Sequence, residues 1–127
     1  MKAYTDLEQS KRLVEILPLK SADMTWEQIT QDLTGDFTWE PAMGLNEAIT
    51  YNLFSFKKGY ILPCWSLAAL LEVINDDYYT TLYHDGVAWN ITAIHHDNVK
   101  DKHNVYANTP VDACVTMIEL LHEQKLL

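Results

Sequence analysis

The sequence predicts an α+β fold, with an antiparallel or mixed sheet of about four strands and three helices packed mainly on one face. The observations behind this prediction are a hairpin signal from Tyr78 to Ile94, a capped amphipathic helix near each end of the chain, and an apolar helix between them. The predicted strands follow one another instead of alternating with crossover helices, which disfavours a purely parallel sheet. Because the 127 residues are 48% apolar and contain no linker-like segment, we expect one globular domain over residues 1–127.

The first helix is predicted from its capping residues. Thr5 is followed three positions later by Glu8, which is the spacing of a capping box, where side chains bind amide groups that the helix leaves unbonded. Apolar residues then recur at helical spacing, and Pro18 opposes continuation of the helix. We therefore expect a helix over residues 6–17.

Two further helices are predicted in the second half of the chain. Thr109 is a suitable cap and Pro110 stands at the first helical position, where no hydrogen-bond donor is lost, so we expect a helix over residues 110–124. Residues 64–74 are almost entirely apolar, which predicts a central helix that is covered on most sides.

The strongest strand signal lies in the second half of the chain. Residues 78–84 and 87–94 are rich in Tyr, Thr, Val and Ile, which favour strands. Asp85-Gly86 between them suits a two-residue hairpin turn, because glycine readily adopts a positive φ angle. Residues 104–107 predict a short final strand.

The first half of the chain is less clear. Residues 48–56 predict a strand, which Lys57-Lys58-Gly59 would end in a turn. Residues 21–33 fit both a strand and a helix, and we favour a strand that ends near Trp26.

Composition limits the classes of function. The chain has 9 Lys and Arg residues against 18 Asp and Glu residues and a net charge of −9, so it repels a phosphate backbone and we expect no direct nucleic-acid binding. A basic protein partner remains compatible with this charge. No apolar run is long enough to span a bilayer and the N-terminus lacks a signal-peptide pattern, so we expect a cytoplasmic protein that does not contact membranes.

Cys64 is the first catalytic candidate. At the start of the predicted central helix, amide dipoles would lower the pKa of its thiol. The string Cys64-Trp65-Ser66 resembles the start of the central helix in papain-like proteases, but the glycine-rich approach is missing and too few residues follow for the remaining catalytic groups. We expect a structural, reduced cysteine, with a disulfide to Cys114 as the alternative.

His84, His95 and Asp97 are the candidate metal ligands. Imidazole and carboxylate suit zinc or nickel, but the adjacent histidines His95 and His96 would point to opposite faces of a strand, so at most one of them joins His84 across the hairpin. Their spacing matches no established metal motif, so a solvated loop is the better interpretation. The sequence also lacks phosphate-binding glycine motifs, and we expect no cofactor.

Trp39 and Met43 are the candidate interaction residues. They fall in a predicted loop, and an exposed aromatic loop would suggest a protein contact. The alternative is that Trp39 is buried as a lid over the sheet.

Four stretches of the sequence carry a resemblance: residues 1–10, 21–24, 63–71 and 109–114. They resemble short uncharacterised proteins of phage-like and conjugative mobile elements of gut Bacteroidetes. The resemblance implies a genetic setting but no activity, cofactor or catalytic residue.

Two hypotheses about function follow. The first is an acidic, non-enzymatic protein-interaction module that binds a basic or host protein, with a homodimer through Leu126-Leu127 or an open sheet edge as a special case. The alternative is a small cysteine- or histidine-centred enzyme or metal-binding protein.

Overall fold

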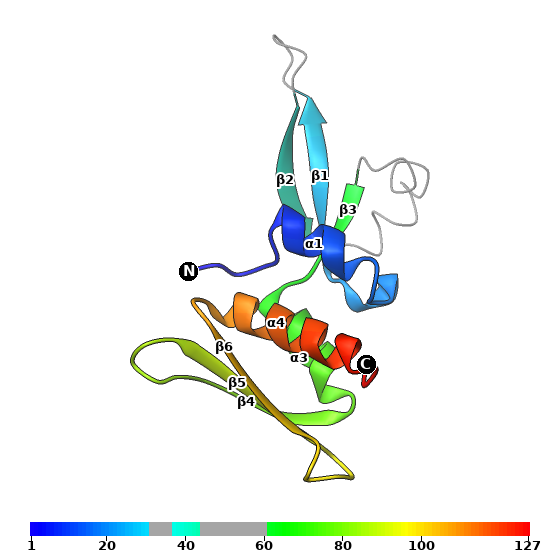
Figure 1. Cartoon of the computed structure of the whole chain (residues 1–127). Coiled ribbons are helices and arrows are strands. Elements are labelled where there is room, and N and C mark those ends of the chain that lie inside the picture. The colour runs from blue at the N-terminus through cyan, green and yellow to red at the C-terminus, as the bar shows by residue number, and fades with distance from the viewer. Residues whose placement is uncertain (31–36, 44–60) are drawn as a thin grey trace. The chain divides into compact units, whose positions relative to one another are not determined.

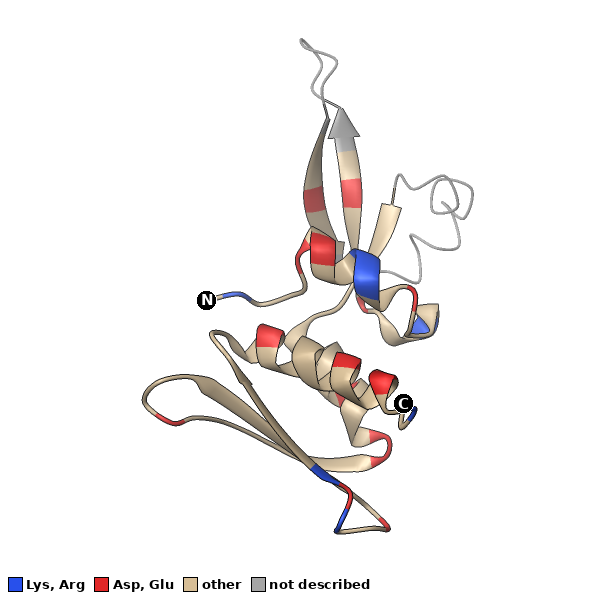
Figure 2. Cartoon of the chain, viewed as in Figure 1, with Lys and Arg blue, Asp and Glu red and all other residues tan. Residues whose placement is uncertain are grey.

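The computed structural model of the chain describes residues 1–30, 37–43 and 61–127 (Figure 1; Figure 2 shows the charged residues in the same view). The chain forms two compact units. We call residues 6–65 the N-terminal unit, and residues 1–5 together with 66–127 the C-terminal unit. Each is described by itself, and the expected single domain over residues 1–127 stays a prediction.

The N-terminal unit contains a three-stranded antiparallel sheet in the order β2-β1-β3. Helix α1 contacts β3. The elements of this unit are α1 (Leu7–Leu13), the 3-10 turn η1 (Leu19–Ser21), β1 (Met24–Thr30), β2 (Phe37–Met43) and β3 (Ile61–Cys64).

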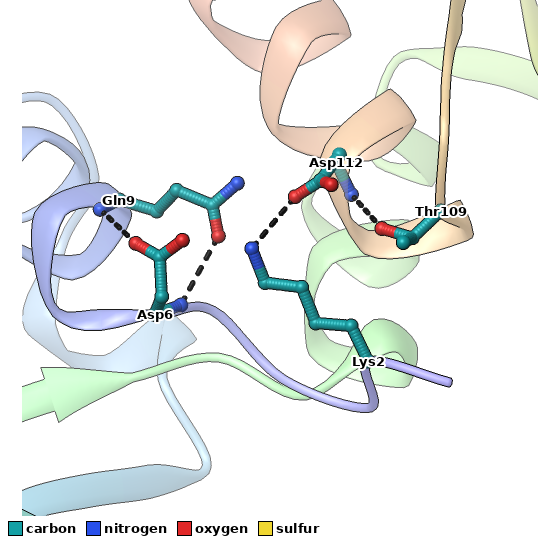
Figure 3. A network of polar contacts seen from close by, with 5 residues as sticks. All are labelled: Lys2, Asp6, Gln9, Thr109 and Asp112. Carbon is teal, nitrogen blue, oxygen red and sulfur yellow. Dashed lines mark hydrogen bonds and ion pairs between the residues drawn. The ribbon is translucent and has the colours of Figure 1, made fainter.

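Helix α1 is capped one residue later than the sequence predicts. The Asp6 carboxylate accepts a hydrogen bond from the Gln9 amide at 2.8 Å, and the Gln9 side chain accepts one from the Asp6 amide at 3.1 Å (Figure 3). Two capping boxes overlap in this sequence, and the Asp6 box forms instead of the Thr5 box. The helix ends at Leu13, so the predicted end at residue 17 is wrong. Backbone hydrogen bonds, two of them between residues three apart, continue the turn to Leu17.

The strands of this unit differ from the prediction in three places. The favoured strand near Trp26 exists as β1 but continues to Thr30. Trp39, expected in a loop, lies in β2. Strand β3 occupies residues that include the predicted start of the central helix. The predicted strand over residues 48–56 and the turn after it lie outside the described residues.

The C-terminal unit has a helix, three strands and a helix in sequence order. Its antiparallel sheet has the order β4-β5-β6 (Figure 1). Helix α3 contacts β4, α4 contacts β5 and β6, and the two helices contact each other, so both cover the same face of the sheet. The elements are α3 (Leu67–Asn75), β4 (Tyr78–His84), β5 (Trp89–His95), β6 (Lys102–Ala107) and α4 (Pro110–Glu123).

Helix α3 begins later than predicted. Its cap is Ser66, whose hydroxyl accepts a hydrogen bond from the Ala69 amide at 3.2 Å. Serine is a strong N-cap and cysteine is not, which explains why Cys64 stays in the preceding strand. Helix α4 matches the prediction, because the Thr109 hydroxyl accepts from the Asp112 amide at 3.1 Å (Figure 3).

The predicted hairpin is confirmed, but its connection is longer than two residues. Pairing ends at His84 and Trp89, which leaves residues 85–88 as the turn. The Asp85 carboxylate accepts hydrogen bonds from the amides of Ala88 and Val87, and these bonds lower its pKa to about 2. Gly86 has a φ of +95°, which favours glycine at that position.

The N-terminal segment belongs to the C-terminal unit. The Lys2 ammonium lies 2.7 Å from the Asp112 carboxylate in the first turn of α4 (Figure 3). The Ala3 carbonyl accepts a hydrogen bond from the Leu67 amide, and Tyr4 forms a β-bridge with Ser66. These contacts hold residues 1–5 beside the starts of both helices of the unit.

The core of the C-terminal unit lies between the sheet and its two helices. Tyr78, Ile91 and Ala93 point toward the helices and are buried, as expected for alternate residues of strands with one covered face. Helix α4 supplies the largest share of the buried side chains: Val111, Ala113, Cys114, Val115, Met117, Ile118 and Leu121.

The α+β class is therefore confirmed, and the predicted sheet of about four strands fits only in part. The described residues form two three-stranded antiparallel sheets. Among them, no helix combines the length and the apolar character needed to cross a bilayer.

Candidate functional site

Cys64 is not placed as the sequence predicts. It is the last residue of β3, where it pairs with Met24, and it is fully buried. Helix α3 begins three residues later, so its amide dipoles do not converge on the Cys64 thiol. Both cysteines are thiols. Burial raises the pKa of the other thiol, that of Cys114, to about 12, which keeps it protonated at neutral pH.

The candidate metal ligands do not come together. His84 pairs with Trp89 and His95 pairs with Tyr78, so the two histidines stand at opposite ends of the β4–β5 ladder, ~20 Å apart at about 3.3 Å per residue. The turn over residues 85–88 sets this register and keeps His84 and His95 apart. The described part of the chain contains no group of three or more His, Cys, Asp or Glu side chains suited to a metal ion.

Each of these histidines has a local structural contact instead. His84 Nδ1 accepts a hydrogen bond from the Gly86 amide at 3.0 Å, and its ring packs edge-on against Trp89. His95 Nδ1 accepts one from the Asp97 amide at 3.1 Å. His84 therefore stabilises the turn that follows β4, and His95 stabilises the connection that follows β5.

The candidate interaction residues lie in the N-terminal unit. Trp39 is half-buried in β2 opposite Gln28, and Met43 ends the same strand opposite Met24. Trp39 shares a face of the sheet with Trp26, which is also half-buried. The predicted aromatic loop is thus a strand, because β1 offers Trp39 and its neighbours a complete antiparallel partner.

A surface that the sequence did not reveal lies on the C-terminal unit. The helices cover one face of the sheet, and the opposite face exposes Tyr79, Tyr83 and Tyr106, with exposed fractions of 68%, 45% and 72%. We call this surface the tyrosine face. It comprises these tyrosines and the six residues that share their side of the strands: Thr81, Asn90, Thr92, Ile94, Lys102 and Asn104.

The register arranges the tyrosine face in rows across the three strands. Tyr83 and Tyr106 flank Asn90 in one row, and Tyr79 lies in the row of Ile94 and Lys102 at the other end. Asn90 is almost fully buried, and its amide donates to the Asp85 carboxylate at 2.8 Å. The tyrosine face is therefore a rigid surface, on which tyrosine rings lie near the side-chain amides of Asn90 and Asn104 and hydrogen bonds hold these amides in place.

Charge is distributed unevenly around this surface. None of its nine residues is Asp or Glu. Exposed carboxylates stand instead in the connections at its two ends, those of Asp76, Asp77 and Asp97 at one end and that of Asp85 at the other (Figure 2). The middle row of the surface is uncharged, and the connections at its two ends carry these carboxylates together with the exposed Lys100.

A buried polar cluster supports one end of the sheet from the helix-covered side. The Tyr78 hydroxyl donates to Asp101 Oδ2 at 2.8 Å, and His103 Nε2 lies 2.5 Å from Asp101 Oδ1. Burial raises the pKa of Tyr78, and the Asp101 carboxylate raises it further. Burial alone would raise the pKa of Asp101, but the hydrogen bonds from Tyr78 and His103 outweigh burial and lower it.

This cluster ties the β5–β6 connection to β4. The Asp101 carbonyl also accepts a hydrogen bond from the His95 amide at 2.9 Å. Asp101 and His103 lie two residues apart in the sequence, whereas Tyr78 comes from β4. The strand register brings Tyr78 to this pair.

No protein-family model, curated protein or solved structure matches this chain at a significant level.

Proposed function

We propose that this protein is a small, non-enzymatic protein-interaction module, and that its tyrosine face binds a protein partner with an apolar centre and a basic rim. The observation that carries the proposal is the exposure of Tyr79, Tyr83 and Tyr106 on the one face of the sheet that the helices leave uncovered.

Exposed tyrosines in a regular sheet are suited to binding proteins. Tyrosine is enriched among the residues that dominate interface energies, because its ring covers a large area and loses little side-chain freedom on binding. Here strand pairing fixes the backbone of all three tyrosines, and Asn90 is locked between Tyr83 and Tyr106. Such a surface orders little on binding, which favours affinity.

The charge distribution indicates the kind of partner. An interface typically has a centre depleted of charge, aromatic residues and a polar rim. The tyrosine face has an uncharged middle row between end rows that carry its tyrosines. The carboxylates in the connections at its two ends and the net charge of −9 attract a basic protein surface at long range and repel nucleic acid. The resemblance to proteins of mobile elements suggests a host protein or a protein of the same element as this partner.

The test is affinity capture from a lysate of the native host, with the wild type and the double variant Tyr83→Ser/Tyr106→Ser. Val87→Ser is the matched control, because Val87 is 90% exposed at the hairpin turn and lies outside the tyrosine face. We expect a protein that the wild type and the control recover and the double variant does not, with recovery falling as salt is raised.

Recovery of nothing above background by the wild type at low and physiological salt contradicts the proposal. Equal recovery by the double variant contradicts the assignment of the surface. No observation favours the alternative of a cysteine- or histidine-centred enzyme or metal-binding protein, since Cys64 is buried and His84 and His95 stand far apart.

A further inference from the structure

Among the described residues, the two sheets have four edge strands, which differ in how they oppose further pairing. Natural proteins block edge strands with proline, charge or short length. In the N-terminal unit, β2 contains Glu40 and Pro41, and β3 has four residues that include Pro63. In the C-terminal unit, β6 contains Lys102.

Strand β4 has none of these features. Its seven residues, Tyr78–His84, include no proline, glycine, Asp, Glu, Lys or Arg. All seven pair with β5 in an unbroken register, so no bulge twists the edge away. Within the described residues, β5 is its only neighbour in the sheet. β4 is therefore an edge on which another strand can pair.

We propose that β4 pairs with β4 of a second copy of this chain, in antiparallel orientation around a two-fold axis at Thr81. The two three-stranded sheets would then form one six-stranded sheet. This inference goes beyond the proposed function and does not depend on it, because it concerns the edge of the sheet rather than the tyrosine face.

The sequence of β4 is complementary to itself in this register. Thr81 lies opposite Thr81 of the second copy, and Tyr79 lies opposite Tyr83, both on the outer side of the sheet. On the inner side, Thr80 lies opposite Leu82, and Tyr78 lies opposite His84. Aromatic and β-branched pairs of this kind stabilise antiparallel strands, and no pair opposes like charges.

The self-complementary register favours a second copy as the occupant of this edge, and charge limits where two copies can meet. Each copy carries a net charge of −9, so contact requires a surface without carboxylates, and β4 is such a surface. Just beyond the strand, Asp77 approaches Asp85 of the second copy at each end of the pairing. Salt screens this repulsion, so we expect association to strengthen as salt is added. Binding of a basic partner has the opposite salt dependence.

The first experiment compares Thr81→Lys with Asn104→Lys by sedimentation equilibrium of the full chain over a range of concentrations. Both positions are exposed and belong to the same row of the tyrosine face, but Thr81 is on the β4 edge and Asn104 is on the β6 edge. Thr81→Lys places two ammonium groups opposite each other at the axis. We expect the wild type and Asn104→Lys to associate from 14.6 kDa to twice that mass, and Thr81→Lys to associate at least about tenfold more weakly.

The second experiment tests the register directly. Paired residues at a two-fold axis have Cα atoms about 4.5–5.5 Å apart, which is within the range of a disulfide. Oxidised Thr81→Cys should therefore migrate as a covalent dimer on a non-reducing gel, and Asn104→Cys should remain a monomer. The native Cys64 and Cys114 are buried and do not interfere.

Three outcomes overturn the proposal. The first is a wild type that stays monomeric at every concentration and salt. The second is equal weakening by both lysine variants, which indicates pairing through the tyrosine face. The third is cross-linking of Asn104→Cys alone, which indicates the β6 edge. Circular dichroism spectra that match the wild type exclude misfolding of either lysine variant as the cause.

Discussion

The two sheets of this protein have the same number of strands and the same antiparallel pairing, but they are assembled from different spans of sequence. In the C-terminal unit, β4, β5 and β6 pair in sequence order across the short connections at residues 85–88 and 96–101. In the N-terminal unit, β1 ends at Thr30 and its neighbour β3 begins at Ile61. The hairpin of the C-terminal sheet was predicted because its turn residues mark it, whereas the pairing of β1 with β2 and with β3 was not predicted.

The surfaces of the two sheets differ as well. The edges of the N-terminal sheet carry proline and glutamate, whereas β4 of the C-terminal sheet carries neither. The C-terminal sheet also exposes the tyrosine face opposite its helices. Among the described edge strands, β4 alone lacks proline, short length and a charged residue, so the difference lies in a few side chains.

The largest effect is expected in the core of the C-terminal unit. Ile118 is fully buried in α4, so Ile118→Ala should lower the free energy of unfolding by about 2–5 kcal/mol through lost burial and a cavity. Thr116→Ala, at an exposed position of the same helix, is the control and should change it by less than about 0.5 kcal/mol. Urea unfolding followed by circular dichroism measures both. Equal effects would show that α4 is not packed as described.

The polar cluster beneath the sheet is expected to have the next largest effect. Asp101→Asn weakens the bonds to Tyr78 and His103 and should cost about 1–3 kcal/mol. Because the pKa of Asp101 is lowered in the folded state, its stabilisation is present above about pH 4 and is lost as the pH falls through the folded pKa. Unfolding measured from pH 7 to pH 2 should therefore show a smaller acid destabilisation in Asp101→Asn than in the wild type. An unchanged pH profile would contradict the role of the cluster.

The choice between the two overlapping capping boxes of α1 can be tested by single substitutions. Asp6→Ala removes the observed cap and should cost about 1 kcal/mol. Glu8 belongs to the predicted cap but lies on the surface, 3.5 Å from Lys11, so Glu8→Ala should cost less than about 0.5 kcal/mol. Thermal unfolding of the two variants distinguishes the boxes, and a reversed order would favour the Thr5 box.

Pro41→Val is expected to have the smallest effect on stability. It tests directly whether an edge strand resists pairing with another chain. Pro41 is exposed on the edge strand β2, where it denies a backbone donor to an incoming strand. Valine restores that donor, so the variant should associate at lower protein concentration than the wild type, as measured by light scattering. Thr38→Val, also exposed on β2, keeps the proline and is the control. No difference between the variants would mean that Pro41 does not protect this edge.

Much of the C-terminal unit could be predicted because its signals are local. Thr109 and Pro110 mark the start of α4, and the strand formers on both sides of Asp85 and Gly86 mark the hairpin. The overlapping capping boxes at Thr5 and Asp6 show the limit of this approach, because two local signals of similar strength compete. Tertiary contacts then select one of them.

The candidate site was harder to predict than the fold. His84 and His95 were weighed together, but His84 lies beside the turn and pairs with Trp89, whereas His95 lies at the far end of β5 and pairs with Tyr78. Tyr79 and Tyr83 are visibly alternate in the sequence, but alternation does not say which face the helices cover. Tyr106 joins them only through β5, and nothing in the local sequence connects these strands.

Local sequence was sufficient for the α+β class, the hairpin and the C-terminal helix, because capping groups, turn residues and apolar spacing act over a few residues. Tertiary structure alone decided that there are two sheets, that Cys64 is buried in a strand, and that three tyrosines share an uncovered face. These features depend on pairing between distant segments, whose free energy comes from burial and backbone hydrogen bonds that no short stretch of sequence contains.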